Sequence, residues 1–426
     1  LKVAARSASL PYRNRTVAPA DLGRELNVGS VLEGTVQRMG DRLRISAFLS
    51  DTSDGRELWS ERYDRDASDI FALQDDIAAS VVNSLRVTLS GLDHRAMVKR
   101  PTASVEAYQL YLRGRHLWNH RQAGSTQKAI QCFREALEID PLYALPYAGL
   151  ADAFASLGAY EYMRPIDAFP KATASAERAL SLDATLAEAH TTLGVAQAHY
   201  AWDWRAGEQS YLEAIALNPR YALAHTYYAL LLSATGRHER AADAIARAAE
   251  IDPISVPIIT IKGYVAYYAR RYDDAIHDYR IALDMDPSFG LAMVLLGYAN
   301  LSRGQYDESI RVFRAIPSPR LTSIGGLGIA LSLTGRTDEA RALLAQMEGA
   351  RTTEYISAFT LSQVHLGLGD RETALSLLES AVAERSYNLS FVASAQPFDS
   401  LRGEPRFAAV LKSIGLEHVP GALVRP

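Results

Sequence analysis

Apolar residues recur at helical spacing through most of the chain, from about residue 104 onward. The stretches "YALAHTYYALLLSATG" (221–236) and "RHERAADAIARAAEI" (237–251) each place an apolar stripe on one face of a helix. The residue before a proline is disfavoured in the α region, so a helix is expected to end there. Asp-Pro or a near equivalent follows such pairs of stripes at 140–141, 182–183, 218–219, 252–253 and 286–287. The pattern predicts a stack of helix pairs, with each such stop at the corner into the next pair.

Small residues recur where two paired helices must approach closely. In the first helix of successive pairs they are Gly194, Ala229, Gly263, Gly297 and Gly328. Larger apolar residues stand in the second helices, at Ile245, Tyr279, Phe313, Leu344 and Leu378. A bulky side chain at Gly263 is therefore expected to destabilise the fold by ~1–3 kcal/mol through overpacking.

These features resemble the tetratricopeptide repeat, with about eight units between residues 104 and 386. The resemblance implies a mainly α fold, a right-handed α-solenoid of helix hairpins. The second unit departs from the pattern, because "GAYEYMRPIDAFPKA" (158–172) lengthens the loop between its helices. Later units lose the closing proline, which Ser318-Pro319 nearly restores. Residues 387–426 are predicted to form a capping segment, in which 398–416 is one amphipathic helix that covers the apolar end of the stack.

The first 92 residues show a different pattern. Residues 1–8 alternate as a strand, 18–27 suit a short helix, and 29–64 predict three strands with hairpin turns at 39–41 and 52–55. A long amphipathic helix is expected over 68–90, capped by Ser68 or Asp69. The pattern predicts a small α+β domain over residues 1–92, followed by a linker over 93–103.

Residues 23–78 of this domain resemble the TolB amino-terminal-like domain, which precedes tetratricopeptide repeats in many bacterial signalling proteins. Members of that family usually begin one strand and one helix earlier. The chain starts with Leu1, not methionine, inside a strand-like run. We therefore expect the domain to be truncated at its start, with a further segment upstream.

The composition of the chain limits the classes of function that it can have. Apolar residues make up 48% and charged residues 22%, which is ordinary for a soluble folded protein. The net charge of −4 disfavours nucleic acid or an anionic membrane as partner. The single cysteine, Cys132, excludes an internal disulfide framework and fits a reducing compartment. A cytoplasmic location is expected, with the periplasmic face of a membrane-anchored protein as the alternative if the upstream segment holds an anchor.

Few residues of the chain are candidates for a catalytic, metal-binding or phosphate-binding site. His116 and His120 have metal-binding spacing on a helix but lack a third ligand, so exposed helix histidines are preferred. For Cys132 a half-buried structural thiol is preferred over a nucleophile. "GGLGIA" (325–330) follows no strand, so helix packing is preferred over a phosphate loop, and "DTSDG" (51–55) is interpreted as a hairpin turn. We expect no catalytic, metal or cofactor site in this chain, and leave open an upstream catalytic domain.

The remaining signal is the concave side of the predicted solenoid, which the first helices line. Tyrosine is frequent at interfaces because it combines apolar area with a hydroxyl, and the chain has 22 Tyr against 11 Phe. Candidate partner-binding residues are His199, Tyr227, Tyr264, Tyr267, Tyr268 and Tyr298. The alternative is that these tyrosines are half-buried packing. Thr191, Thr226, Thr260 and Val294 stand where some of these repeats clamp a terminal carboxylate, so a peptide held by aromatic contacts is favoured.

The leading hypothesis is a protein-interaction and sensory module of a larger bacterial signalling protein. Resemblance implies an alternative, in which the chain is the regulatory C-terminal part of a class III nucleotide cyclase, a Ser/Thr kinase or a winged-helix regulator. A homo-oligomeric scaffold whose stacks pair through their ends is the third hypothesis.

Overall fold

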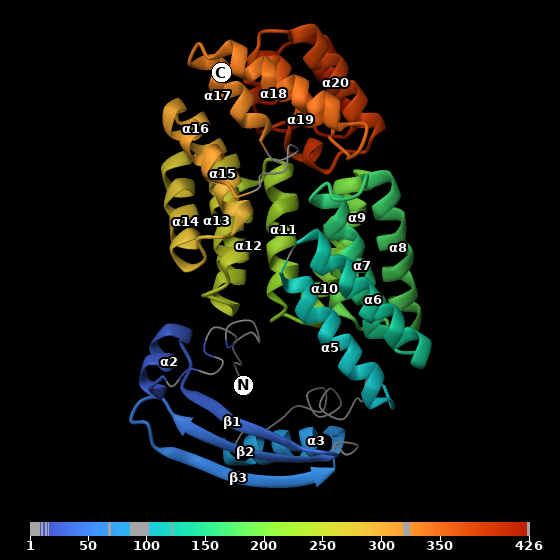
Figure 1. Ribbon diagram of the computed structural model, residues 1–426, viewed down its shortest axis with the longest axis vertical. Coiled ribbons are helices and arrows are strands. Elements are labelled where there is room, and N and C mark those ends of the chain that lie inside the picture. The colour runs from blue at the N-terminus through green and yellow to red at the C-terminus, as the bar shows by residue number, and fades with distance from the viewer. Residues whose placement is uncertain are drawn as a thin grey trace. The chain divides into compact units, whose positions relative to one another are not determined.

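The computed structural model describes residues 9, 12, 15, 17–66, 70–85, 102–120, 122–317 and 324–423 (Figure 1). The chain divides into a sheet unit, residues 1–113 with 134–143, and a repeat unit, residues 114–133 with 144–426. The sheet unit thus extends past residue 92 into the first predicted repeat. The expectations for residues 1–8, for a cap at Ser68 or Asp69, for most of the linker and for Ser318-Pro319 lie outside the described residues.

The sheet unit holds a three-stranded antiparallel sheet of order β1-β2-β3. Its elements are α2 (Pro19–Leu26), β1 (Ser30–Met39), β2 (Arg42–Asp51), β3 (Glu57–Asp66) and α3 (Ile70–Ser84). Gly40 and Gly55 have φ values of 61° and 71° in the two hairpin turns, a conformation that glycine adopts without steric cost. The short helix, the three strands and both turns confirm the sequence prediction, while the TolB-like identity stays a prediction.

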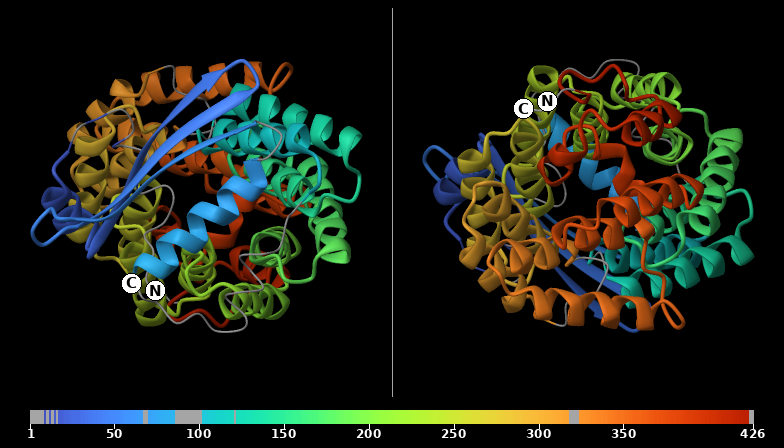
Figure 2. Two further views of the ribbon diagram at one scale, coloured as in Figure 1. Left: turned by 90° about the horizontal axis from the view of Figure 1, so that it is seen from below. Right: turned by 90° about the horizontal axis from the view of Figure 1, so that it is seen from above.

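From residue 105 onward the described chain forms eight helix pairs. The first four are α5 (Val105–Asn119) with α6 (Ala123–Ile139), α7 (Ala144–Ala159) with α8 (Pro165–Leu182), α9 (Ala187–Ala196) with α10 (Trp204–Leu217), and α11 (Ala222–Ala234) with α12 (His238–Ile251). The others are α13 (Val256–Tyr268) with α14 (Tyr272–Met285), α15 (Gly290–Ser302) with α16 (Tyr306–Ala315), α17 (Gly325–Leu333) with α18 (Thr337–Ala350), and α19 (Ala358–Gly367) with α20 (Arg371–Ala383). In Figure 2 (right), the helices coloured green to orange follow a curve. A mainly helical array of hairpins preceded by a small sheet is confirmed.

The corners between pairs show why Asp or Asn stands at these positions. At four of the five corners, those at residues 140, 183, 218 and 286, this side chain accepts a hydrogen bond from the backbone N–H two residues on, as Asp286 Oδ1 does from Ser288 at 2.9 Å and Asn218 Oδ1 from Arg220 at 3.1 Å. This Asx turn gives a backbone N–H of the corner a hydrogen-bond partner at the point where the helix ends. Asp and Asn therefore turn the chain at these four corners, and a proline follows three of them, Asp140, Asn218 and Asp286, where it prevents the helix from continuing.

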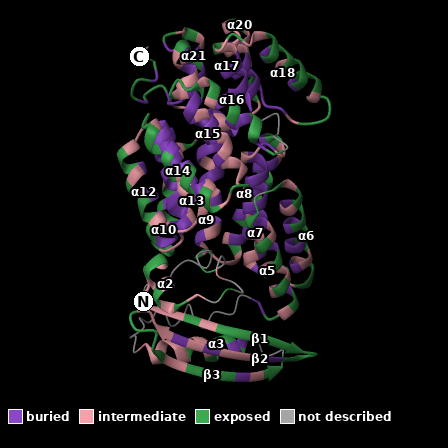
Figure 3. Cartoon of the chain, turned by 60° about the vertical axis from the view of Figure 1, so that its left-hand side comes forward, coloured by how far each residue is buried: buried purple, intermediate pink, exposed green. Residues whose placement is uncertain are grey.

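The interior of the pairs confirms the small-residue pattern. A Cβ atom placed on Gly263 would lie 2.6 Å from the Tyr279 ring, and one on Gly297 would lie 2.7 Å from the Phe313 ring. Tyr279 and Phe313 are almost completely buried. Each glycine thus admits the ring of its paired helix, and Figure 3 shows buried residues running through the array.

The C-terminal part corrects one expectation. Residues 398–416 do not form one helix: a 3₁₀ turn, η6 (Gln396–Leu401), is followed by α21 (Pro405–Ser413). Gly403 between them has φ 87°, and Pro405 cannot extend a preceding helix. Helix α21 packs on α20, as a cap is expected to do. A further 3₁₀ turn, η5 (Tyr387–Phe391), contacts α7, α11 and α20, which belong to three different pairs.

No helix in the described part of the chain combines the length and the apolar character needed to cross a lipid bilayer.

Candidate functional site

The first helices of five consecutive pairs line a small apolar chamber, which we call the trough. Its volume is about 130 Å³, and α7, α9, α11, α13 and α15 all contribute to its wall. Residues that face it include Leu223, Tyr227, Ile261, Tyr264, Leu291 and Leu295. The 3₁₀ turn η5 closes it with Tyr387, Asn388 and Phe391. No charged side chain lines the trough among the residues that the structure describes.

The six predicted partner-binding residues do not form one exposed surface. Tyr227 and Tyr264 are half-buried and face the trough. His199, Tyr267 and Tyr268 are buried, with exposed fractions of 0%, 5% and 9%. Their partner-binding role stays a prediction, but all three side chains are buried in this structure, and η5 contacts two of them, His199 and Tyr268.

Tyr298 and Tyr267 have internal hydrogen-bond partners. The Tyr298 hydroxyl donates to Gln363 Oε1 at 2.7 Å and accepts from the Gly326 N–H at 3.0 Å. The Tyr267 hydroxyl lies 3.1 Å from Ser302 Oγ, within hydrogen-bond distance. For both residues, therefore, the structure favours the alternative of half-buried or buried packing.

Phe391 of η5 occupies the place where a partner's side chain was expected. Its ring centroid lies 5.1 Å from that of Tyr268, 5.2 Å from Tyr264 and 5.4 Å from His199. Such offset and edge contacts add to the free energy of burying the rings. The predicted aromatic cluster thus already binds an aromatic residue, and that residue belongs to the same chain.

His199 lies in a one-turn π-helix, η3 (Gln197–Ala201), between α9 and α10. Neither of its ring nitrogens has a hydrogen-bond partner among the described residues, although the side chain is fully buried. The rings of Trp204, Tyr387 and Phe391 surround it. Burial in this apolar setting lowers the pKa of His199 to about 3, so the imidazole is neutral at physiological pH.

Burial also raises the pKa of Tyr264, Tyr268 and Tyr387 well above the usual value for tyrosine. Their hydroxyls therefore stay protonated and do not act as bases or nucleophiles. The Tyr268 hydroxyl donates to that of Tyr264 at 3.2 Å. An uncharged wall of aromatic and aliphatic groups with a few hydroxyls suits the binding of an apolar or aromatic segment.

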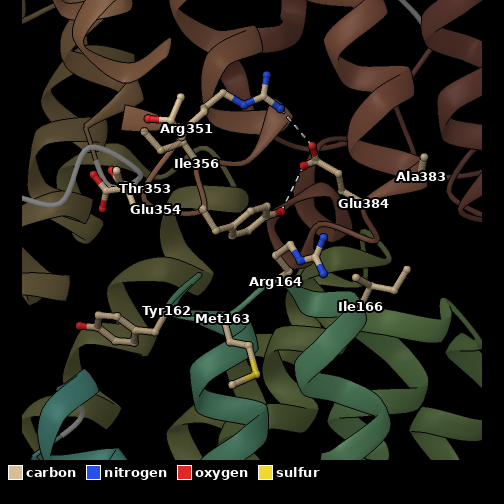
Figure 4. Close-up of a pocket in the computed structure, with 12 residues that line it drawn as sticks. Tyr162, Met163, Arg164, Ile166, Arg351, Thr353, Glu354, Ile356, Ala383 and Glu384 are labelled. Atoms are coloured by element: carbon tan, nitrogen blue, oxygen red, sulfur yellow. Dashed lines mark hydrogen bonds and ion pairs between the residues drawn. The ribbon is translucent and has the colours of Figure 1, made fainter. Parts of the chain in front are cut away.

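A second cavity, of about 720 Å³, lies beside the lengthened loop of the second pair (Figure 4). The loop residues Tyr162, Met163 and Arg164 form one side, and residues 351–356 form the other. Glu384 links the parts of this wall, since its Oε2 accepts from the Tyr355 hydroxyl at 3.1 Å and from the Ala358 N–H at 3.0 Å. The departure of the second repeat from the pattern therefore shapes this cavity.

The other sequence candidates have structural explanations. The rings of His116 and His120 contact each other edge to face at 5.1 Å, and the described residues contain no group of three potential metal ligands. Cys132 is buried. Residues 325–330 belong to helix α17, where Gly326 meets the Tyr298 ring and Gly328 meets Val364, which confirms the packing interpretation. Residues 51–55 form the turn between β2 and β3, as predicted.

Sequence reasoning expected the turns between the paired helices but missed their backbone conformation. In four pairs a glycine stands there with positive φ, namely Gly236, Gly304, Gly335 and Gly369. In three other pairs Glu161, Trp202 and Arg270 have φ values of 57°, 59° and 60°. A side chain in this conformation costs roughly 1–2 kcal/mol. The signal was visible in "ARRYDDA" (269–275), since this turn lacks the glycine of the turns that resemble it.

These three side chains contact the C-terminal part of the chain. Glu161 Oε1 accepts from Asn388 Nδ2 at 3.0 Å, and the Arg385 guanidinium lies 4.8 Å from the centre of the Trp202 ring. Arg270 donates to both carboxylate oxygens of Asp399, each at 2.6 Å. The contacts between the repeats and the C-terminal part therefore continue beyond the trough to these three turns.

Three segments of the chain match family models described as tetratricopeptide repeat, at residues 115–141, 210–243 and 262–320. Together with the helix pairs, these matches show that the chain contains tetratricopeptide repeats.

Two bacterial regulatory proteins are similar to parts of the chain. "Putative adenylate cyclase 3" of Rhizobium meliloti is 35% identical over 198 residues, which are 46% of this chain and 34% of that protein. "Transcriptional regulator HilA" of Salmonella typhimurium is 27% identical over 173 residues, 41% of this chain and 31% of that protein. The chain thus spans about a third of the length of these relatives. A solved tetratricopeptide repeat protein of Thermus thermophilus, TTC0263, covers 46% of this chain and 99% of its own, at 18% identity and a TM-score of 0.39.

Proposed function

We propose that this chain is a regulatory protein-interaction module of a larger bacterial signalling protein, and that its repeats bind a peptide segment of a protein partner at the trough. In this proposal the chain itself carries out no reaction, requires no cofactor and acts in the cytoplasm. The sheet unit, as a TolB-like domain, would connect the repeats to an output domain.

One observation carries the proposal: the first helices of five pairs converge on an uncharged trough walled by tyrosine and aliphatic side chains. Surfaces of this kind bind peptide segments through buried aromatic contacts at their centre. Tetratricopeptide repeats at 115–141, 210–243 and 262–320 support the assignment to the class of interaction modules.

Calorimetry with a candidate partner tests the trough directly. Tyr227→Ala removes a half-buried ring from the wall, and we expect partner affinity to fall about tenfold or more, as for a central contact residue. The matched control is Tyr306→Ala, since Tyr306 is also half-buried but packs on a core cluster away from the trough. Equal affinity of the two variants would contradict binding at the trough.

A second candidate rests on the two bacterial relatives. The match to a protein named as an adenylate cyclase and to one named as a transcriptional regulator supports a role as the regulatory part of a nucleotide cyclase or a winged-helix regulator. A Ser/Thr kinase as the output domain stays a prediction from the sequence resemblance. Determining the genomic sequence that precedes the codon for Leu1 tests all three. An in-frame cyclase, kinase or DNA-binding domain would support this candidate, whereas a stop codon directly upstream would contradict it.

The homo-oligomeric scaffold also stays a prediction. Light scattering over a dilution series tests it: a constant monomer mass would contradict it, and a mass that rises with concentration would support it.

A further inference from the structure

We infer that residues 385–401 are an intramolecular ligand of the trough, and that a protein partner binds by displacing them with a segment that carries two aromatic side chains four residues apart. This inference rests on the proposed function and names the chemistry of the partner. We call residues 385–401 the internal ligand.

The aromatic pair of the internal ligand provides the template for this chemistry. Tyr387 and Phe391 stand four residues apart in "YNLSF". Phe391 contacts His199, Tyr264 and Tyr268, while the Tyr387 ring lies 5.0 Å from that of His199. One short turn of chain thus places two rings on a wall built by several first helices.

The basic residue before this pair adds a third contact. The Arg385 Nη1 donates to the carbonyls of Tyr200 and Ala201 at 3.2 and 3.3 Å, and its guanidinium lies over the Trp202 ring. Carbonyls at the end of a helix and an indole face both attract a cation. A competing segment is therefore expected to carry Lys or Arg two residues before its first aromatic residue.

The turns show that the repeats are shaped to hold this segment. Arg270 and Trp202 adopt positive φ where other repeats have glycine, and each contacts the internal ligand with its side chain. Arg385 itself has φ 55°, two residues after the end of α20 at Ala383, which gives the segment a sharp bend at its start. Residues that only capped the array would not require side chains in this conformation at two separate turns.

The fit between the internal ligand and the trough is incomplete, and this makes displacement feasible. Within the described chain, His199 Nδ1 and Nε2, Trp202 Nε1 and Ser386 Oγ are buried without a hydrogen-bond partner. Such unsatisfied groups weaken the contact. In addition, the chamber of about 130 Å³ remains between η5 and the trough wall. A partner segment that fills this space and hydrogen-bonds His199 would bind more tightly than the internal ligand does.

The experiment loosens the internal ligand without creating strain. The double variant Arg270→Gly/Arg385→Gly removes the contacts to Asp399 and Trp202, and glycine is favourable at both positive φ values. Hydrogen exchange of the full chain is measured by mass spectrometry. We expect the amides of residues 387–401 to exchange about tenfold faster in the variant, while those of α13 and α14 stay unchanged. The matched control is Arg303→Gly, which removes an exposed ion pair with Asp273 at the next turn and is expected to leave residues 387–401 protected.

A peptide then tests the chemistry of the partner. The probe is a fluorescein-labelled peptide with the sequence of residues 384–395, "ERSYNLSFVASA", and anisotropy reports its binding to the full chain. We expect about tenfold tighter binding to the double variant than to the wild type, in line with the exchange result. A peptide with both aromatic residues changed to alanine is expected not to bind either protein.

Four outcomes would overturn the inference. Residues 387–401 could remain protected in the double variant, or α13 and α14 could lose protection together with them; either would show that the segment is an inseparable part of the core. Binding of the alanine peptide equal to that of the native peptide would refute the aromatic recognition. If a partner requires Tyr227 but the native peptide does not compete with it, the proposed function stands and the internal ligand fails.

Discussion

The middle repeats and the C-terminal contact are stabilised in different ways. In α13 and α14, Gly263 and Tyr279 pack together from neighbouring helices, and the same arrangement recurs as Gly297 with Phe313, 34 residues later. The contacts of the C-terminal part join residues far apart in the chain, such as Asn388 with Glu161 and Arg270 with Asp399. The comparison suggests that repeated local contacts hold the array, while a long-range contact with unsatisfied polar groups is the part suited to release.

We expect the largest effect on the free energy of unfolding from a substitution between the two helices of one repeat. Gly263→Leu would push a side chain into the Tyr279 ring and the Ala275 carbonyl, so we expect the free energy of unfolding to fall by about 3 kcal/mol. Gly349→Leu is the matched control, because a Cβ at that exposed helix position would meet nothing within 4 Å beyond its chain neighbours and the backbone of its own helix. Urea unfolding followed by circular dichroism measures both. A control as destabilised as the test variant would show that close helix packing is not the cause.

A pH series addresses the C-terminal contact. Burial lowers the pKa of His199 from 6.5 to about 3 in the folded chain. Below pH 6.5 the imidazole of His199 binds a proton in the unfolded chain but stays neutral in the folded chain. Its contribution to the free energy of unfolding, which is fully present above pH 6.5, is therefore lost progressively as pH falls toward 3. The loss at pH 5 is roughly 2 kcal/mol.

The variant His199→Leu separates this effect from other groups. Burial also lowers the pKa values of His225 and His238, which contribute acid destabilisation of the same sign. We therefore expect the wild type to lose roughly 2 kcal/mol more free energy of unfolding than His199→Leu when the pH falls from 7.5 to 5, measured by urea unfolding. A difference that does not depend on pH would contradict the neutral buried state of His199.

A smaller effect of opposite sign is expected at Tyr279. Its hydroxyl is buried without a hydrogen-bond partner in the described chain, whereas Phe313 stands at the corresponding place in the next repeat. Tyr279→Phe is therefore expected to stabilise the fold by about 1 kcal/mol, measured by thermal and urea unfolding.

The control for Tyr279→Phe is Tyr228→Phe. The Tyr228 hydroxyl donates to Glu208 Oε1 at 2.9 Å and accepts from Arg240 at 2.6 Å, so its loss is expected to destabilise by about 1 kcal/mol. If both variants moved in the same direction, hydrogen bonding would not explain the difference between the two tyrosines.

The smallest effect is expected at an ion pair of the C-terminal part. Arg270→Gln removes the pair with Asp399 and is expected to destabilise by about 0.5–1 kcal/mol, with less effect at high salt. Arg303→Gln removes an exposed pair with Asp273 and is expected to have almost no effect. Thermal unfolding at low and high salt compares the two. Equal, salt-independent shifts would contradict a specific role for Arg270.

Most of the fold could be predicted because its cause is local. The Asx turn at Asp286-Pro287, the glycine turns at 40 and 55 and the space at Gly263 each follow from a few neighbouring residues. The break after η6 was also predictable, since Gly403 and Pro405 interrupt the helical pattern that was assigned to residues 398–416. The prediction of one helix rested on the apolar periodicity and neglected these two residues.

The candidate site could be predicted only in part. The periodic pattern placed Tyr227 and Tyr264 on the inner face of the array, where they line the trough. It did not predict that Phe391 would cover Tyr268 and His199, more than a hundred residues earlier in the chain. No periodicity links η5 to η3 or α13, so no sequence spacing could reveal this contact.

The sequence by itself determined the helix pairs, their corners, the small residues between them and the three strands, because these depend on backbone preferences and on contacts within one or two elements. Only the tertiary structure decided what covers the inner face. Each helix pair is rotated slightly relative to the one before it, and these small rotations add up to the curve of the array. The curve brings the C-terminal part of the chain back to the earlier repeats, where it covers their inner face.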